Sequence, residues 1–150
     1  IGLMVSGCSG QASSPKMGEV TAEDFQITLN ERKLNLNAVF STGYYGESLS
    51  YYEAESCGFA GLDKIYTYTD YEIYTYPVNA KDQVLEIKFL ENTKTSKKIG
   101  VGSTLADVKK VYGEKGVETG NLLEYTFDHS VLSMLLDNGR VSELSFVYLP

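Results

Sequence analysis

The same succession of local patterns occurs twice along this chain, and this repetition limits the fold more than any other feature. In the second half, Thr104 precedes an apolar-periodic stretch, Asp107 follows three residues later as in a capping box, and Gly113 suits the left-handed position at a helix end. The apolar side chains of this stretch share one helical face: Leu105, Val108, Val111 and Tyr112. The pattern predicts a short helix between Thr104 and Gly113.

The first half repeats this order in a weaker form. A basic pair, alternating apolar residues, a short helical stretch and a closing Tyr-Gly-Glu recur, but Ser41 and Gly43 lower the helix propensity of the first copy. The corresponding segments are 32–33 and 97–98, 45–47 and 112–114, 66–68 and 125–127, and 84–89 and 141–146. Chance is the alternative explanation, because short strand patterns resemble one another.

We therefore predict an α+β fold of two similar units, 23–92 and 93–150, each a short helix region packed on an antiparallel meander, together forming one extended sheet. The expected strands are 64–69, 72–78 and 83–90 in the first unit, and 122–128, 131–136 and 140–148 in the second. Asn138-Gly139 is the strongest hairpin signal. Alternating apolar residues over 25–36 predict an entry hairpin ahead of the helix of the first unit, and the polar segment 92–98 is expected to be an exposed linker.

The helix-plus-meander repeat resembles secreted β-lactamase-inhibitor proteins and related bacterial lipoproteins that contain one or two such units. The residues that carry this resemblance are Gly100-Val101-Gly102-Ser103-Thr104, Asp107-Val108 and Tyr112-Gly113, with a partial echo from Leu36-Asn37 to Tyr45-Gly46. The resemblance covers about 25–150. It implies a binding protein that grips another protein with the sheet face opposite its helices.

The chain departs from this family pattern in two respects. Asn37 and Gly43 stand where stronger helix-forming residues are expected, and the disulfides usual within each unit cannot form here. Inhibition of a β-lactamase therefore does not carry over from the resemblance.

The amino-terminal residues predict where the protein resides. Val5-Ser6-Gly7-Cys8-Ser9 follows an apolar run and resembles a lipobox, in which small residues admit the signal peptidase and the cysteine thiol receives lipid. We expect residues 1–7 to end a signal peptide, Cys8 to carry the lipid, and the small, polar segment 8–22 to be a flexible tether. The expected location is the extracytoplasmic face of a bacterial cell membrane. The alternative is an ordinary buried strand that contains a cysteine.

Composition narrows the possible partners. A formal charge of −7 and a pI near 4.7 argue against nucleic acid or an anionic surface as the main partner. With Cys8 lipidated, Cys57 has no disulfide partner, and its acidic and apolar neighbours favour an inert thiol.

No motif predicts catalysis, a metal or a cofactor. His129 stands between Asp128 and Ser130, but adjacent turn residues point apart, whereas a catalytic triad needs converging side chains. One histidine and one cysteine are too few for a zinc site. Gly100-Val101-Gly102 lacks the third glycine and the lysine of phosphate-binding loops. Clustered carboxylates such as Glu53 with Glu55, or Asp63 with Asp70, would be needed for a hydrolase, the least favoured alternative.

Tyrosine is the better functional signal, because twelve tyrosines occur against six phenylalanines and no tryptophan. Tyrosines provide large, rigid contact area at low entropic cost. Four are predicted to share one sheet face, as core or as an exposed platform: Tyr66, Tyr68, Tyr74 and Tyr76. The others are expected in loops or turns: Tyr44, Tyr45, Tyr51, Tyr52 and Tyr71. These nine are the predicted partner-binding residues of a non-enzymatic module that holds an envelope or extracellular protein or peptide. The alternative function is a structural subunit that adds its edge strand to an envelope assembly.

Overall fold

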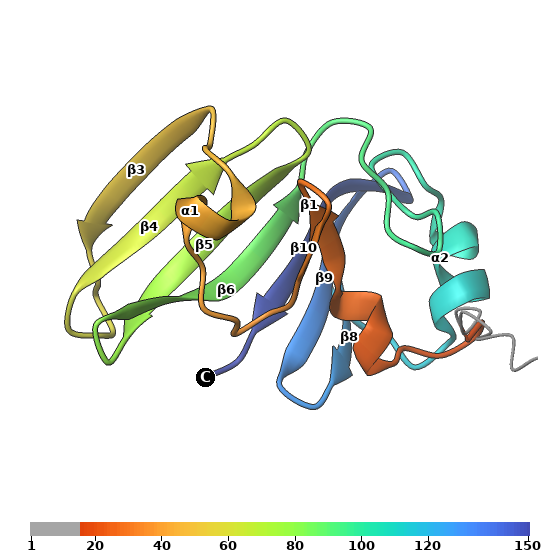
Figure 1. Ribbon diagram of the computed structural model, residues 1–150. Helices are drawn as coiled ribbons and strands as arrows, with labels where there is room; N and C mark the ends of the chain where they lie inside the picture. The colour runs from red at the N-terminus through yellow and green to blue at the C-terminus, as the bar shows by residue number, and fades with distance from the viewer. Residues whose placement is uncertain (1–15) are drawn as a thin grey trace, which may run out of the picture.

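The computed structural model describes residues 16–150, so the predicted signal-peptide end and the lipid-attachment residue Cys8 lie outside the described part. Most of the chain forms an antiparallel sheet of eight strands in the order β3-β4-β5-β6-β10-β9-β8-β7 (Figure 1). The strands are β3 (Ser50–Glu55), β4 (Leu62–Thr67), β5 (Tyr71–Val78), β6 (Lys81–Phe89), β7 (Val117–Thr119), β8 (Leu122–Phe127), β9 (Ser130–Asp137) and β10 (Arg140–Tyr148).

The remaining elements are short. They are the 3-10 helix η1 (Ala22–Phe25), the two-stranded sheet of β1 (Ile27–Leu29) and β2 (Arg32–Leu34), and the helices α1 (Thr42–Tyr45) and α2 (Leu105–Tyr112). Within residues 16–150, none of the helices has the length and apolar character needed to cross a bilayer.

One face of the large sheet carries the core. Directly opposed residues of neighbouring strands share a face, and one buried row crosses six strands. The row is Tyr66, Ile73, Ile87, Phe146, Leu132 and Tyr125. Phe25 of η1 packs on Phe146, and Phe40, just before α1, packs on Tyr66. Tyr112 of α2 packs on Tyr125. Among residues 16–150, the helices therefore pack on this face of the sheet, and we call the opposite face the open face.

The fold confirms the expected α+β class and the extended antiparallel sheet. Thr104 and Asp107 form the predicted capping box of α2, and Gly113 ends the helix with φ of +93°. Asn138 and Gly139, both with positive φ, join β9 to β10 as predicted. The predicted first hairpin is the pair β1–β2, which turns at Asn30-Glu31.

Other expectations need correction. The structure does not divide clearly into two repeated units: α1 has only four residues against eight in α2, and the small β1–β2 sheet has no counterpart in the second half. Two edge strands were not predicted. The stretch that forms β3 was interpreted as loop, and β7 has only three residues.

The hairpin between β5 and β6 turns through Asn79 and Ala80, which have φ of +49° and +63°. Asparagine tolerates this left-handed conformation, whereas alanine is strained there because its Cβ approaches the following carbonyl oxygen.

We expect Ala80→Gly to stabilise the fold by about 0.5–1 kcal/mol. The substitution removes the strain of a left-handed alanine, roughly 1–2 kcal/mol. Glycine also gives the unfolded chain more conformational entropy, which opposes this gain by about 0.4–1 kcal/mol. Urea denaturation measures the difference. Ala60→Gly is the matched control, since Ala60 lies in an exposed loop without positive φ and should gain nothing. If Ala80→Gly is no more stable than the parent protein, the claim of backbone strain at Ala80 is contradicted.

Candidate functional site

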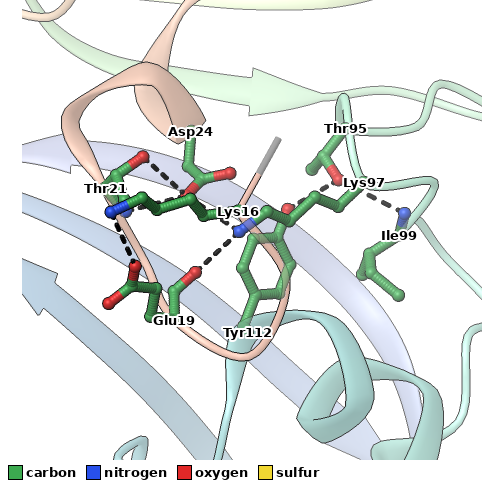
Figure 2. A network of polar contacts seen from close by, with 8 residues as sticks. All are labelled: Lys16, Glu19, Thr21, Asp24, Thr95, Lys97, Ile99 and Tyr112. Carbon is green, nitrogen blue, oxygen red and sulfur yellow. Dashed lines mark hydrogen bonds and ion pairs between the residues drawn. The ribbon is translucent and has the colours of Figure 1, made fainter. Parts of the chain in front are cut away.

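The most enclosed polar cluster joins the amino-terminal segment to the loop before α2 (Figure 2). Lys97 Nζ lies 3.1 Å from Asp24 Oδ2 and donates to the Glu19 carbonyl at 2.6 Å. Asp24 also accepts the Thr21 backbone N–H at 2.8 Å. The two charged side chains are almost fully buried. The segment 92–98, predicted to be an exposed linker, is therefore partly interior, because Lys97 finds its counter-charge beneath η1.

Tyr112 extends this cluster. Its hydroxyl donates to Thr95 Oγ1 at 2.6 Å, its ring lies 5.0 Å from Lys97 Nζ, and burial raises the pKa of the phenol. Thr95 Oγ1 in turn accepts the Ile99 N–H. Among residues 16–150, no buried side-chain atom of this cluster lacks a hydrogen-bond partner. The buried polar atoms of this cluster are paired within the fold, which indicates a structural role.

We expect Lys97→Met to destabilise the protein by about 3–5 kcal/mol, because it leaves the Asp24 carboxylate buried without its counter-charge. The double variant Asp24→Asn/Lys97→Met should recover most of this loss, since it removes both charges and keeps an acceptor for the Thr21 N–H. Denaturant unfolding measures both.

The exposed pair Lys16–Glu19 provides the control. Lys16→Met should cost less than about 1 kcal/mol. A Lys97→Met variant that costs no more than this control contradicts a buried pair.

The nine predicted tyrosines do not form one surface. A shared face for Tyr66, Tyr68, Tyr74 and Tyr76 is wrong: Tyr66 is opposed to Ile73, and Tyr74 is opposed to Ile65. Because the turn at 69–70 has two residues, each even-numbered residue of β4 is opposed to an odd-numbered residue of β5. Opposed residues share a face, so Tyr66 and Tyr74 point to opposite sides of the sheet.

Four of the tyrosines are buried: Tyr45, Tyr66, Tyr68 and Tyr76. Three of these donate their hydroxyls within the fold. Tyr45 reaches the Lys33 carbonyl, Tyr68 the Gly46 carbonyl and Tyr76 the side chain of Asn37. These rings therefore belong to the core or its rim.

Tyr71 and Tyr74 are half-buried. Tyr71 was predicted in a turn, but it is the first residue of β5 and packs on Phe89. Tyr74 lies on the open face and donates to Glu72 at 3.0 Å. Burial first, and then this hydrogen bond and the acidic neighbours, raise its pKa to about 12.

The exposed tyrosines gather at the β3 end of the molecule. Tyr44, predicted in a loop, lies within α1, and its ring centroid is 4.1 Å from Cζ of the Arg32 guanidinium. Tyr51 and Tyr52, predicted in a loop, are part of strand β3 and are 49% and 63% exposed. Leu49, which sequence reasoning did not single out, is 75% exposed beside them. We call Leu49, Tyr51 and Tyr52 the β3 patch.

β3 is the outermost strand, and its outer edge has no strand partner among residues 16–150. The Ser56 N–H bonds to the Gly61 carbonyl, which fixes the alternation of the β3–β4 ladder. Along an edge strand of an antiparallel sheet, the backbone N–H and C=O groups of successive residues alternately bond to the neighbouring strand and point away from it. The N–H and C=O groups of Tyr51, Glu53 and Glu55 therefore point away from β4.

The carboxylate pairs considered from the sequence do not form an acid–base site. Glu53 is opposed to Lys64 and accepts a hydrogen bond from the Tyr51 hydroxyl, which raises the pKa of that phenol. Asp63 and Asp70 lie at opposite ends of β4. Glu53 is therefore engaged by Tyr51 and lies opposite a lysine, and the second pair is separated by the length of β4.

The other candidate residues are also separate. His129 is exposed in the β8–β9 turn, with Nδ1 3.0 Å from the Leu149 carbonyl oxygen. Cys57, for which an inert thiol was expected, is exposed in the β3–β4 loop. The amides of Gly100 and Gly102 are bonded to Ser103 and Val141, so they are not free to cradle a phosphate. In the described part of the chain, no three His, Cys, Asp or Glu side chains converge as metal ligands.

The open face is acidic at its centre. Glu86 of β6 is opposed to Tyr74 on one side and to Val147 on the other. Burial raises the pKa of its carboxyl, and the charges of Glu72 and Glu143 act in the same direction. A bond from Ser145 and the charge of Lys88 oppose this shift.

Because the folded-state pKa of Glu86 is raised, ionisation of this group destabilises the fold at neutral pH, and the loss disappears as pH falls through the raised pKa. We expect Glu86→Gln to raise Tm at pH 7 by up to about 3 °C, a bound set by solvent screening of a half-buried group. The gain should shrink toward pH 4.

Thermal melts at several pH values measure this effect. Glu118→Gln, on exposed β7, serves as the control and should leave Tm unchanged. A pH-independent gain in Glu86→Gln would show that packing, not charge, is responsible.

No protein-family model matches the chain, and comparison with curated proteins and with solved structures also yields no match.

Proposed function

We propose that this chain is a non-enzymatic binding module, anchored through lipid on Cys8 at the extracytoplasmic face of a bacterial membrane, that holds a protein partner at the β3 edge. The observation that carries the proposal is that one strand, β3, combines exposed aromatic side chains with backbone groups that have no strand partner among residues 16–150. Tyr51 and Tyr52 extend to opposite faces of β3, and the backbone N–H and C=O groups of Tyr51 and Glu53 point to the outer edge. An extended segment of a partner can add to this edge as a ninth strand.

The charge of the β3 end indicates the chemistry of the partner. The stretch 47–63 contains four acidic residues and neither lysine nor arginine. Their charges favour a basic partner segment and make its association sensitive to salt.

A hollow beside the β3 patch can receive a partner side chain. It has a volume of about 270 Å³, and its lining includes Leu49, Tyr68 and Tyr71 together with the acidic residues Glu47 and Asp70. An apolar wall with two carboxylates matches a long basic side chain, whose stem packs while its cationic head is paired.

We also infer that the scaffold is a duplicated helix-plus-meander unit, as in the β-lactamase-inhibitor proteins that the sequence resembles. The strand order supports this inference, because four consecutive strands on each side meet at β6 and β10 and each set follows a short helix. In this arrangement β3 and β7 are equivalent outer strands, and only β3 is long enough to receive a partner strand.

Edge variants test the binding proposal. Glu53→Pro removes an outward N–H and leaves the β4 ladder intact, since proline is tolerated where an edge strand faces solvent. Glu53→Thr is the matched control, because it removes the same carboxylate and keeps the N–H. With envelope proteins captured on the full chain, we expect Glu53→Pro to reduce retention of its partner at least about 30-fold, as for a binding hot spot.

Glu53→Thr should retain the partner to within about fivefold, the contribution of one rim charge. Equal retention by the wild type and Glu53→Pro contradicts recognition at the edge. Both variants are first checked for an unchanged circular-dichroism spectrum.

The alternative, a structural subunit of an envelope assembly, uses the same unpaired edge. It predicts a stoichiometric complex that survives gel filtration, whereas a reversible binding module dissociates on dilution.

A further inference from the structure

The lysines of this acidic chain are concentrated around α2. Residues 92–116 contain six lysines and two acidic residues, a formal charge of +4, while the rest of the chain carries −11. The overall charge of −7, which argues against an anionic partner, is therefore an average over two regions of opposite sign.

Part of this basic region forms a hollow beside α2. It has a volume of about 630 Å³, and Lys94, Lys98 and Lys110 line it with exposed ammonium-bearing side chains. Two exposed apolar residues, Met17 and Val101, line the same hollow. We call these five residues the basic α2 surface.

The charges of this surface are available to a partner. Among residues 16–150, no carboxylate lies within 4.0 Å of the ammonium groups of Lys94, Lys98 or Lys110, whereas Lys97 is neutralised by Asp24. Asp107 is the one acidic residue in the lining, and it is engaged in the α2 capping box.

The basic α2 surface lies at the end of the described chain that is nearest in sequence to the predicted lipid-attachment residue Cys8, which favours an anion of the membrane as its ligand. The Gly18 N–H bonds to the Val111 carbonyl at 3.0 Å, which fixes the start of the described chain against α2. Cys8 precedes Lys16 by eight residues, which span at most about 29 Å when fully extended. A lipid on Cys8 therefore keeps this end of the molecule near the membrane.

The proposed recognition edge lies at the other end. Figure 1 shows β3 and α2 at opposite ends of the molecule, and β3 is seven strand spacings from β7, roughly 33 Å along the sheet.

We propose that the basic α2 surface docks on anionic phospholipid headgroups. Lys94, Lys98 and Lys110 bind the phosphates, while Met17 and Val101 reach the interface between headgroups and acyl chains. The surface orients the anchored protein so that β3 faces away from the membrane. This inference rests on the proposed lipid anchor for its biological setting, but the surface binds lipid without it.

Vesicle cosedimentation of the full chain carrying Cys8→Ser tests the surface apart from acylation. We expect binding at low salt to vesicles that contain phosphatidylglycerol, and binding to pure phosphatidylcholine vesicles that is weaker by at least tenfold. Added salt should weaken the first interaction. Lys98→Gln/Lys110→Gln should reduce binding to the anionic vesicles about 30-fold, or about fivefold per lysine.

The matched control is Lys33→Gln/Lys81→Gln, which removes the same charge from two exposed lysines outside this surface and should change binding less than about twofold. If both double variants lose binding to anionic vesicles equally, net charge alone explains the binding and the proposal is overturned. Equal binding to both kinds of vesicle overturns it as well.

Soluble polyphosphate is the third arm. Binding to polyphosphate without binding to anionic vesicles assigns the surface to a soluble polyanion and overturns the lipid assignment. Glu53→Pro, the edge variant, should bind vesicles like the wild type, so failure of the β3 proposal and failure of this one are distinguishable.

Discussion

The antiparallel pairing of β6 with β10 is the contact on which the whole architecture depends. Only three residue pairs form it, yet it joins four strands on one side to four on the other. Beneath it, Ile87 is opposed to Phe146 within the buried row that crosses the sheet. Because this junction makes one sheet of eight strands, just two outer edges remain in that sheet. β7 offers three residues and β3 offers six, so the longer free edge lies at one end of the protein.

The buried pair of Lys97 and Asp24 determines what occupies the other end. It holds the segment that precedes η1 against the loop before α2, and it removes one lysine from the surface by neutralising it. The lysines that remain exposed share that end with the beginning of the described chain. Charge is therefore distributed asymmetrically along the molecule: the β3 end is acidic and the α2 end is basic. This polarity is consistent with a protein that meets a membrane at one end and a partner at the other.

The sequence predicted those elements whose signals are local. The capping box at Thr104 and Asp107, and the turn at Asn138-Gly139, depend on residues close in the chain. β3 was missed because both of its faces are exposed, so the strand has no alternation of apolar and polar residues. The burial of Lys97 depends on Asp24, 73 positions away, which no local pattern can reveal. The side of the sheet to which Tyr74 points depends on the register of the β4–β5 hairpin, and the length of the turn sets that register. Of the candidate site, the sequence found the exposed tyrosines but not the edge on which two of them lie.

Amide hydrogen exchange of the free protein, resolved by residue along β3, tests the central claim most directly. A free outer edge predicts alternation. The amides of Tyr51, Glu53 and Glu55 should exchange at least about tenfold faster than those of Tyr52 and Ala54, which bond to β4. Uniform protection of all five amides would show that the edge is already occupied, by another part of the chain or by a second copy, and would contradict a β3 edge that is open to a partner.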